Sequence, residues 1–191
     1  QVNREYIKIE EEHPGPRCVN AALEFLDVNK NSDNWFLQLE CFDPHEPFFV
    51  PDHYKENLPE SGYNGPVLDW PRYGPAEYEP EEVAELRRNY HALVAMCDTH
   101  FGYLLDYLDR HDMWKDTAVI VTTDHGFLLG EHDWWGKNTP PYFEEISHIP
   151  LMIHIPGDSE FSSNRNDWVT QTHDLMPTIL DLHGVKIPKE V

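Results

Sequence analysis

Three side chains that can bind a metal ion or an anion lie close together in the sequence, at Asp124, His125 and Lys137. Asp124 and His125 come directly after an apolar run, and Gly126 lets the chain turn sharply behind them. Lys137 follows on the far side of a loop rich in glycine and tryptophan. A carboxylate and an imidazole together suit several divalent metals, and a poorly hydrated ammonium group attracts anions strongly. The pattern indicates a site for a metal ion and an anionic group.

Each of these residues also has a simpler interpretation. Asp124 and His125 alone could be a loop aspartate beside a hydrogen-bonded histidine, and most lysines lie on the protein surface. Trp134 and Trp135, just before Lys137, favour the functional interpretation. Their rings can exclude water and hold the aliphatic stem of the lysine.

Two further histidines are candidates for the same site. His45 lies in a turn after the apolar segment 35–42, between two prolines. If that segment is a strand parallel to residues 117–123, His45 and Asp124 meet at one edge of the sheet, where α/β proteins bind ligands. A histidine there can act as a general acid or as a donor to an anion. His132 could line the pocket, pair with Glu131 or be a further metal ligand.

The elements that must position these side chains alternate along the chain. Apolar patterns predict helices and strands in the order typical of an α/β layer fold. The segment 48–80 is a long irregular excursion, and its many aromatic residues favour an ordered loop with a functional role. The predicted strands are residues 6–10, 35–42, 117–123 and 149–155, and the predicted helices are residues 18–26, 80–110 and 173–182.

Composition limits the class of protein. A chain of 191 residues is one domain or a large piece of one. With 35 Asp and Glu against 14 Lys and Arg, the net charge is -21, which repels nucleic acid and anionic membrane surfaces. We therefore expect neither as a partner. The three cysteines are too few for a disulfide framework, and we expect free, buried thiols.

Five stretches between Cys18 and Lys186 carry a resemblance to a known family. They read W-F-L-Q-L-E-C-F-D-P-H-E-P-F, N-Y-H-A-L-V-A-M-C-D-T-H-F-G-Y-L-L-D-Y-L, V-I-V-T-T-D-H-G-F-L-L-G-E-H-D-W-W-G-K-N, I-P-L-M-I-H-I-P-G and H-D-L-M-P-T-I-L-D-L-H-G. In this order they resemble the sulfatases of the alkaline phosphatase superfamily, with iduronate-sulfatase-like enzymes nearest and phosphonate monoester hydrolases next. The resemblance implies part of a three-layer α/β sandwich with a mostly parallel central sheet.

The resemblance also implies roles for the candidate residues. Asp124 and His125 match the later pair of metal ligands, and Lys137 matches the lysine that contacts sulfate oxygens. His45 matches the histidine of an H-x-P motif beside the leaving-group oxygen, and we place His132 in substrate binding. Family members hydrolyse sulfate esters through a hydrated formylglycine and a metal ion, usually Ca²⁺. Because calcium prefers oxygen ligands, His125 leaves Mn²⁺ or Zn²⁺ open.

Other parts of the family pattern are missing from the sequence. There is no C/S-x-P-S-R motif to supply the formylglycine, and the early aspartates of the metal site are absent. We therefore expect residues 1–191 to be the later half of a sulfatase catalytic domain, without the N-terminal nucleophile segment or the smaller C-terminal subdomain.

Such a fragment is expected to be inactive alone and to need the missing N-terminal segment of the same protein. The expected substrate is a small-molecule or carbohydrate sulfate ester. The alternatives are a phosphonate monoester or phosphodiester hydrolase of the same superfamily, and a non-catalytic structural or complementing half.

Overall fold

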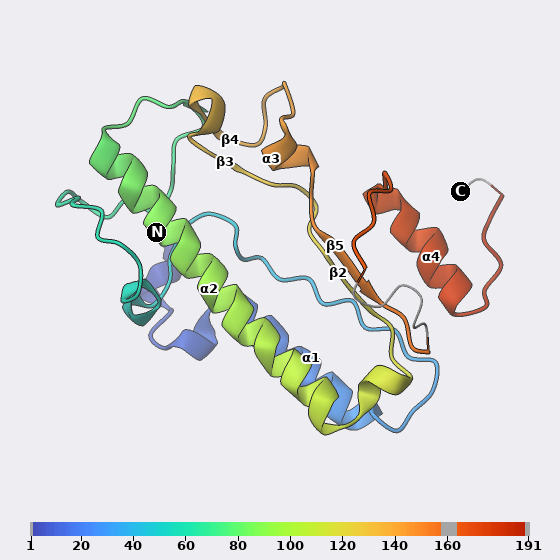
Figure 1. Cartoon of the computed structure of the whole chain (residues 1–191). Coiled ribbons are helices and arrows are strands. Elements are labelled where there is room, and N and C mark those ends of the chain that lie inside the picture. Colours follow the sequence, from blue (N-terminus) through green and yellow to red (C-terminus); the bar gives the residue numbers. More distant parts are fainter. Residues whose placement is uncertain (1, 158–163, 190–191) are drawn as a thin grey trace.

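The computed structural model describes residues 2–157 and 164–189, and it combines helices with short paired strands (Figure 1). The helices are α1 (Pro14–Asn29), α2 (Pro80–Arg110), α3 (Glu144–Ser147) and α4 (Leu175–Leu182). The strands are β1 (Gly74–Pro75), β2 (Val119–Thr122), β3 (Leu128–Leu129), β4 (Trp134–Gly136) and β5 (Leu151–His154). Short 3₁₀ turns lie at Val2–Glu5, Glu10–Glu12, Asp52–Lys55, Met113–Lys115, Glu131–Asp133 and Thr172–Asp174.

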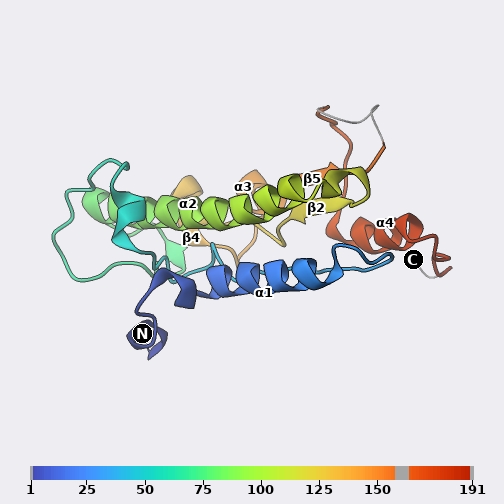
Figure 2. The ribbon, with the colours of Figure 1, turned by 90° about the horizontal axis from the view of Figure 1, so that it is seen from below.

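Helix α2 has the bounds that the sequence predicts. Pro80 takes its first turn, where a missing N–H costs no hydrogen bond, and the Glu82 carboxylate caps the N–H of Glu79 at 2.9 Å. The helix runs beside α1, as Figure 2 shows. Between the two helices lies the first apolar cluster, which consists of Val19, Ala22, Leu26, Leu104, Tyr107, Leu108 and Met113.

A second apolar cluster joins the other half of α2 to the long irregular segment and to β4. Trp135 of β4 and Phe48 of the irregular segment are almost fully buried in it. The remaining members are Val50, Leu86, Ala92, Leu93 and Met96. This cluster holds the chain just after His45 and just before Lys137 against the same helix.

The strands form two small antiparallel sheets. β2 pairs with β5, from Val119 opposite His154 to Thr122 opposite Leu151. β4 lies between β1 and β3 in the second sheet. The mixture of helices and strands agrees with the predicted α/β class, but no parallel pair of strands occurs within residues 2–157 and 164–189.

The strand predicted at residues 35–42 is wrong for this structure. The segment is irregular there, although its burial alternates as in a strand: Trp35, Leu37 and Leu39 pack against the first cluster while the residues between them are exposed. A strand is defined by ladder hydrogen bonds to a neighbouring strand, and no strand among the described residues pairs with this segment. The apolar pattern records burial of one face, which is necessary for a half-buried strand but not sufficient.

Some of the remaining structural predictions are confirmed and others are wrong. The strand predicted at residues 6–10 is wrong, because residues 6–9 are an irregular link between two 3₁₀ turns and Glu10 begins the second of them. Helix α1 is longer than predicted and α4 shorter. All three cysteines are free, as expected, but none is buried: Cys18 and Cys97 are partly exposed, and Cys41 is exposed. None of the helices in the described part of the chain is long and apolar enough to span a membrane.

Candidate functional site

The structure brings two of the predicted site residues into direct contact. His45 lies in the turn at residues 43–47, and Lys137 comes directly after β4. The Lys137 Nζ lies 2.7 Å from the Nε2 of His45. The histidine Nδ1 lies 2.8 Å from the backbone oxygen of Glu46 and donates to it, which leaves Nε2 free to accept from the ammonium.

Lys137 is well shielded from water. Its side chain is 11% exposed, and its ammonium faces the ring of Phe127 at 5.9 Å. Trp135, which the sequence placed near the lysine stem, is buried in the second apolar cluster, against which Phe127 also packs. The ring of Phe42 lies against that of His45 at 4.5 Å. The pair therefore lies between two phenylalanine rings, in a setting that strengthens its interaction with an anion.

A buried carboxylate lies beside the pair, and sequence reasoning missed it. The side chain of Glu46 is 4% exposed, and its Oε2 lies 3.8 Å from the Nζ of Lys137 and 3.4 Å from the Nδ1 of His45. Its Oε1 accepts the hydroxyl of Tyr73. Burial, and next the bond to Glu46, raise the pKa of Tyr73 and keep it a donor. The only signal in the sequence was the position of Glu46 inside the H-x-P motif.

Asp124 and His125 also lie together, at the end of β2. One carboxylate oxygen of Asp124 accepts the backbone N–H of His125 at 2.9 Å, and the other lies 3.4 Å from its Nε2. Partial burial, the largest single influence, raises the pKa of Asp124. The charge of His125 and the backbone hydrogen bonds together outweigh it, so the pKa is lowered. The carboxylate is therefore ionised at neutral pH, as a metal ligand must be.

The turn after these two residues is fixed by α3. The N–H of Gly126 donates to the backbone oxygen of Ile146 at 2.8 Å. A Cβ at Gly126 would lie 1.8 Å from the backbone oxygen of Glu145, so glycine is required by the close approach of the two backbones.

The donors at Asp124 and His125 fit a divalent metal ion only as part of a larger ligand set. Their chemistry is suitable, and the Asp124 side chain is 81% exposed, so both can be reached. In the parts of the chain that the structure describes, no group of three or more His, Cys, Asp or Glu residues is arranged to hold a metal. No contact there joins this pair to His45; Phe127, whose ring faces Lys137, lies two residues after His125.

His132 does not pair with Glu131, which was one of the possibilities that the sequence left open. Its Nε2 lies 3.1 Å from both carboxylate oxygens of Glu145, and its ring stacks on Phe143 at 3.7 Å. Glu131 instead faces Arg87, at 3.8 Å. Because the Glu145 backbone packs on Gly126, the contact ties the loop of His132 to the Asp124–Gly126 turn.

An open hollow of about 500 Å³ adjoins the buried carboxylate. It is lined by Glu46 and by residues of the long irregular segment, Trp70, Pro71, Arg72 and Tyr73. Trp70 is 54% exposed, so part of its ring is accessible at the hollow. The hollow offers an aromatic surface and the Arg72 side chain beside Glu46, the residue that adjoins the His45–Lys137 pair.

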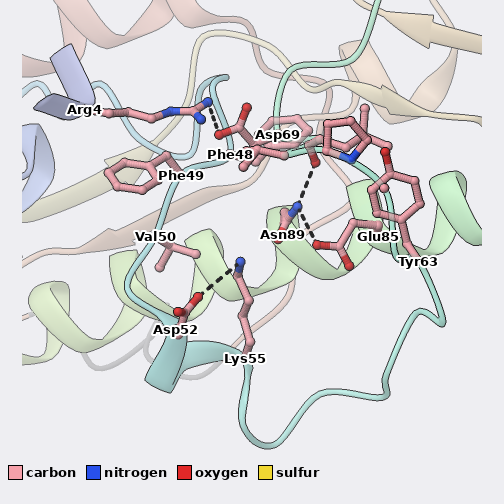
Figure 3. Close-up of a pocket in the computed structure, with 14 residues that line it drawn as sticks. Arg4, Phe48, Phe49, Val50, Asp52, Lys55, Tyr63, Asp69, Glu85 and Asn89 are labelled. Atoms are coloured by element: carbon pink, nitrogen blue, oxygen red, sulfur yellow. Dashed lines mark hydrogen bonds and ion pairs between the residues drawn. The ribbon is translucent and has the colours of Figure 1, made fainter. Parts of the chain in front are cut away.

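Polar contacts anchor this irregular segment to α2 around a second hollow of about 450 Å³ (Figure 3). The side-chain amide of Asn89 donates to the backbone oxygen of Leu68 at 2.8 Å, and Arg4 forms an ion pair with Asp69. None of the predicted site residues lines this hollow. Its contacts fix the chain on the N-terminal side of Trp70 and so help to place the residues beside the site.

Comparisons with solved structures define the class of fold. A phosphonate monoester hydrolase from Silicibacter pomeroyi superposes with a TM-score of 0.76 at 29% identity, covering 95% of this chain and 40% of that one. A second structure, of a protein in complex with its substrate D-glucosamine-2-N,6-O-disulfate, has a TM-score of 0.51 at 32% identity and covers 58% of this chain and 22% of its own. The chain thus has part of the α/β fold of these two proteins.

Residues 7–185 match the Sulfatase family, and the chain belongs to that family, within the alkaline phosphatase superfamily. Human iduronate 2-sulfatase is 28% identical over 75% of this chain and 31% of its own length. The chain spans no more than 40% of the length of the curated relatives with the strongest matches.

Proposed function

We propose that the full-length protein hydrolyses sulfate esters, and that this chain supplies the later half of the active site. The contact between His45 and Lys137 carries the proposal. It joins an ammonium group that can bind a sulfate oxygen to an imidazole that can protonate a leaving group, as the reaction requires. Membership of the Sulfatase family supports the same reaction class.

Each residue has a proposed role. Lys137 binds a non-bridging sulfate oxygen, and His45 lies beside the leaving-group oxygen. Asp124 and His125 hold a divalent metal ion, which neutralises charge on the sulfate when bound. Ca²⁺ is the first candidate, with Mn²⁺ or Zn²⁺ open because of the imidazole ligand. His132 orients the loop around the substrate.

The rest of the protein completes the site in this proposal. It supplies the formylglycine nucleophile and the remaining metal ligands, since Asp124 and His125 make up only part of a ligand set. We further propose that it adds strands beside residues 35–42, whose alternating burial suits a sheet position, to complete a three-layer sandwich with a mostly parallel sheet.

The substrate is proposed to be a sulfated carbohydrate. The hollow beside Glu46 has the volume of a small-ligand site, and Trp70 offers a flat face for a sugar ring. One similar structure contains a sulfated glucosamine as the substrate of that protein.

Trp70→Ala is expected to raise the KM for D-glucosamine-2-N,6-O-disulfate by roughly threefold to tenfold, the value of one aromatic contact. The KM for 4-nitrophenyl sulfate should stay within twofold, because its small leaving group does not reach the hollow. Tyr6→Ala, which removes another exposed aromatic ring, is the control. Equal changes for both substrates would remove the hollow from substrate binding.

A comparison of substrates on the intact protein tests the proposal itself. We expect 4-nitrophenyl sulfate to be turned over with a higher kcat/KM than a 4-nitrophenyl phosphonate monoester. The similarity to the phosphonate monoester hydrolase favours a higher kcat/KM for the phosphonate. That result would make phosphonate monoester hydrolysis the function. The isolated 191-residue chain should turn over neither ester, and measurable turnover by it would contradict the view that the nucleophile lies elsewhere.

A further inference from the structure

The carboxylate of Glu46 is the most unusual charged group of the described residues. It is buried, and its Oε2 has no hydrogen-bond partner although it faces two cationic or donor groups, the Nδ1 of His45 and the Nζ of Lys137. A buried carboxylate oxygen in this condition is costly, and such groups usually persist because function requires them. The burial of Glu46 therefore points to a role for its carboxylate in the function of the site.

The neighbours of Glu46 hold it firmly beneath the site. Tyr73 donates its hydroxyl to Oε1, and the ring of Tyr73 packs on Gly136 so closely that a Cβ there would lie 2.8 Å from it. Gly136 directly precedes Lys137. The carboxylate, the tyrosine and the lysine are thus coupled through one short stretch of backbone.

We propose that Glu46 is a positioning residue for the sulfatase reaction, acting through His45 and Lys137. Without substrate, the ammonium of Lys137 is shared between the imidazole Nε2 and this carboxylate. When a sulfate oxygen binds Lys137, Nε2 is released from the ammonium, takes up a proton from water to form the imidazolium, and gives that proton to the leaving-group oxygen. Glu46 then faces the Nδ1–H of the imidazole and stabilises the ring in that orientation.

This proposal rests on the proposed function. It implies that the charge of Glu46 has opposite effects on substrate binding and on turnover. A buried negative charge 3.8 Å from the sulfate-binding ammonium opposes the approach of an anion. Its removal should therefore favour substrate binding while it weakens proton donation. A residue that only supported the fold would have neither signature, since its loss would lower kcat and raise KM together.

The test compares Glu46→Gln with the intact full-length protein on 4-nitrophenyl sulfate and phenyl sulfate. For phenyl sulfate, the poorer leaving group, kcat should fall about tenfold to a hundredfold, which is part of the roughly hundredfold to ten-thousandfold contribution of general acid catalysis. For 4-nitrophenyl sulfate the fall should be several times smaller, because that leaving group needs less protonation. KM should stay the same or fall for both.

Two variants complete the design. Tyr73→Phe removes the donor that holds the carboxylate and should reproduce the leaving-group dependence more weakly. Glu144→Gln removes the same charge from an exposed side chain and should change neither constant. Equal losses of kcat for the two esters, or a raised KM in Glu46→Gln, would overturn the proposal.

The design separates this proposal from the proposed function. If the protein cleaves phosphonate monoesters but no sulfate ester, the proposed function fails. The same two leaving groups on a phosphonate then decide the role of Glu46. Binding of inorganic sulfate, measured by calorimetry, gives a readout without turnover, and Glu46→Gln should bind it at least as tightly.

Discussion

Lys137→Ala is expected to lower kcat for a sulfate ester by about a hundredfold to a thousandfold in the full-length protein, the usual cost of removing one donor to a developing anion. The reason is local: the lysine side chain is only 11% exposed, so its ammonium, which faces the ring of Phe127 and the imidazole of His45, is poorly screened by water. The fold should persist, because Lys137 belongs to neither apolar cluster. Steady-state kinetics and circular dichroism measure the two effects.

Lys115→Ala is the matched control for this substitution. Its side chain is 63% exposed and pairs only with Asp112 on the surface, at 2.8 Å, so kcat should not change. An unchanged kcat in Lys137→Ala would remove the lysine from the mechanism. A loss of helical signal in that variant would mean that lowered activity reports misfolding instead.

Gly126→Ala is expected to damage both stability and activity. The new Cβ would lie 1.8 Å from the backbone oxygen of Glu145, and neither backbone can give way without breaking the hydrogen bond from Gly126 to Ile146. Overpacking of this kind costs about 1–3 kcal/mol of unfolding free energy. A displacement of Asp124 and His125 by about 1 Å should lower kcat by about a hundredfold.

Gly102→Ala is the control, because the same methyl group meets nothing within 4 Å at that helical position. It should raise the unfolding free energy by about 0.5–1 kcal/mol, since alanine favours the helix. Thermal unfolding of both variants, with activity measured below the transition, separates the effects. Wild-type stability in Gly126→Ala would contradict the close packing of α3 on this turn.

Elements defined by local signals could be predicted from the sequence. Helix α2 was predicted at its observed bounds, because Pro80 and the acidic residues after it mark the start and the apolar spacing continues to the end. The irregular conformation of residues 35–42 could not be predicted in this way. Their alternating pattern reports burial of one face, while strand formation depends on a neighbouring strand far away in the sequence. The same limit applies to the predicted parallel sheet.

The candidate site likewise contains residues that could be predicted from the sequence and residues that could not. His45 and Lys137 were predicted as site residues from their motifs, whereas their contact with each other was not, since the sequence placed His45 beside Asp124. Their roles stay predictions. Glu46 was missed because a glutamate is usually exposed, and only the path of the long segment brings Tyr73 over it. The partner of His132 was not predictable, since that residue has a left-handed backbone (φ 55°) that no hydrophobic pattern reveals.

The length of α2 determines how cooperatively the chain unfolds. One uninterrupted helix contributes Leu93 and Met96 to one apolar cluster and Leu104 and Leu108 to the other. Loss of either cluster would leave half of a helix without tertiary support, and isolated helical segments of that size are marginal in water. The two clusters should therefore unfold as one cooperative unit, and a calorimetric scan should show a single transition in which the calorimetric and van't Hoff enthalpies agree.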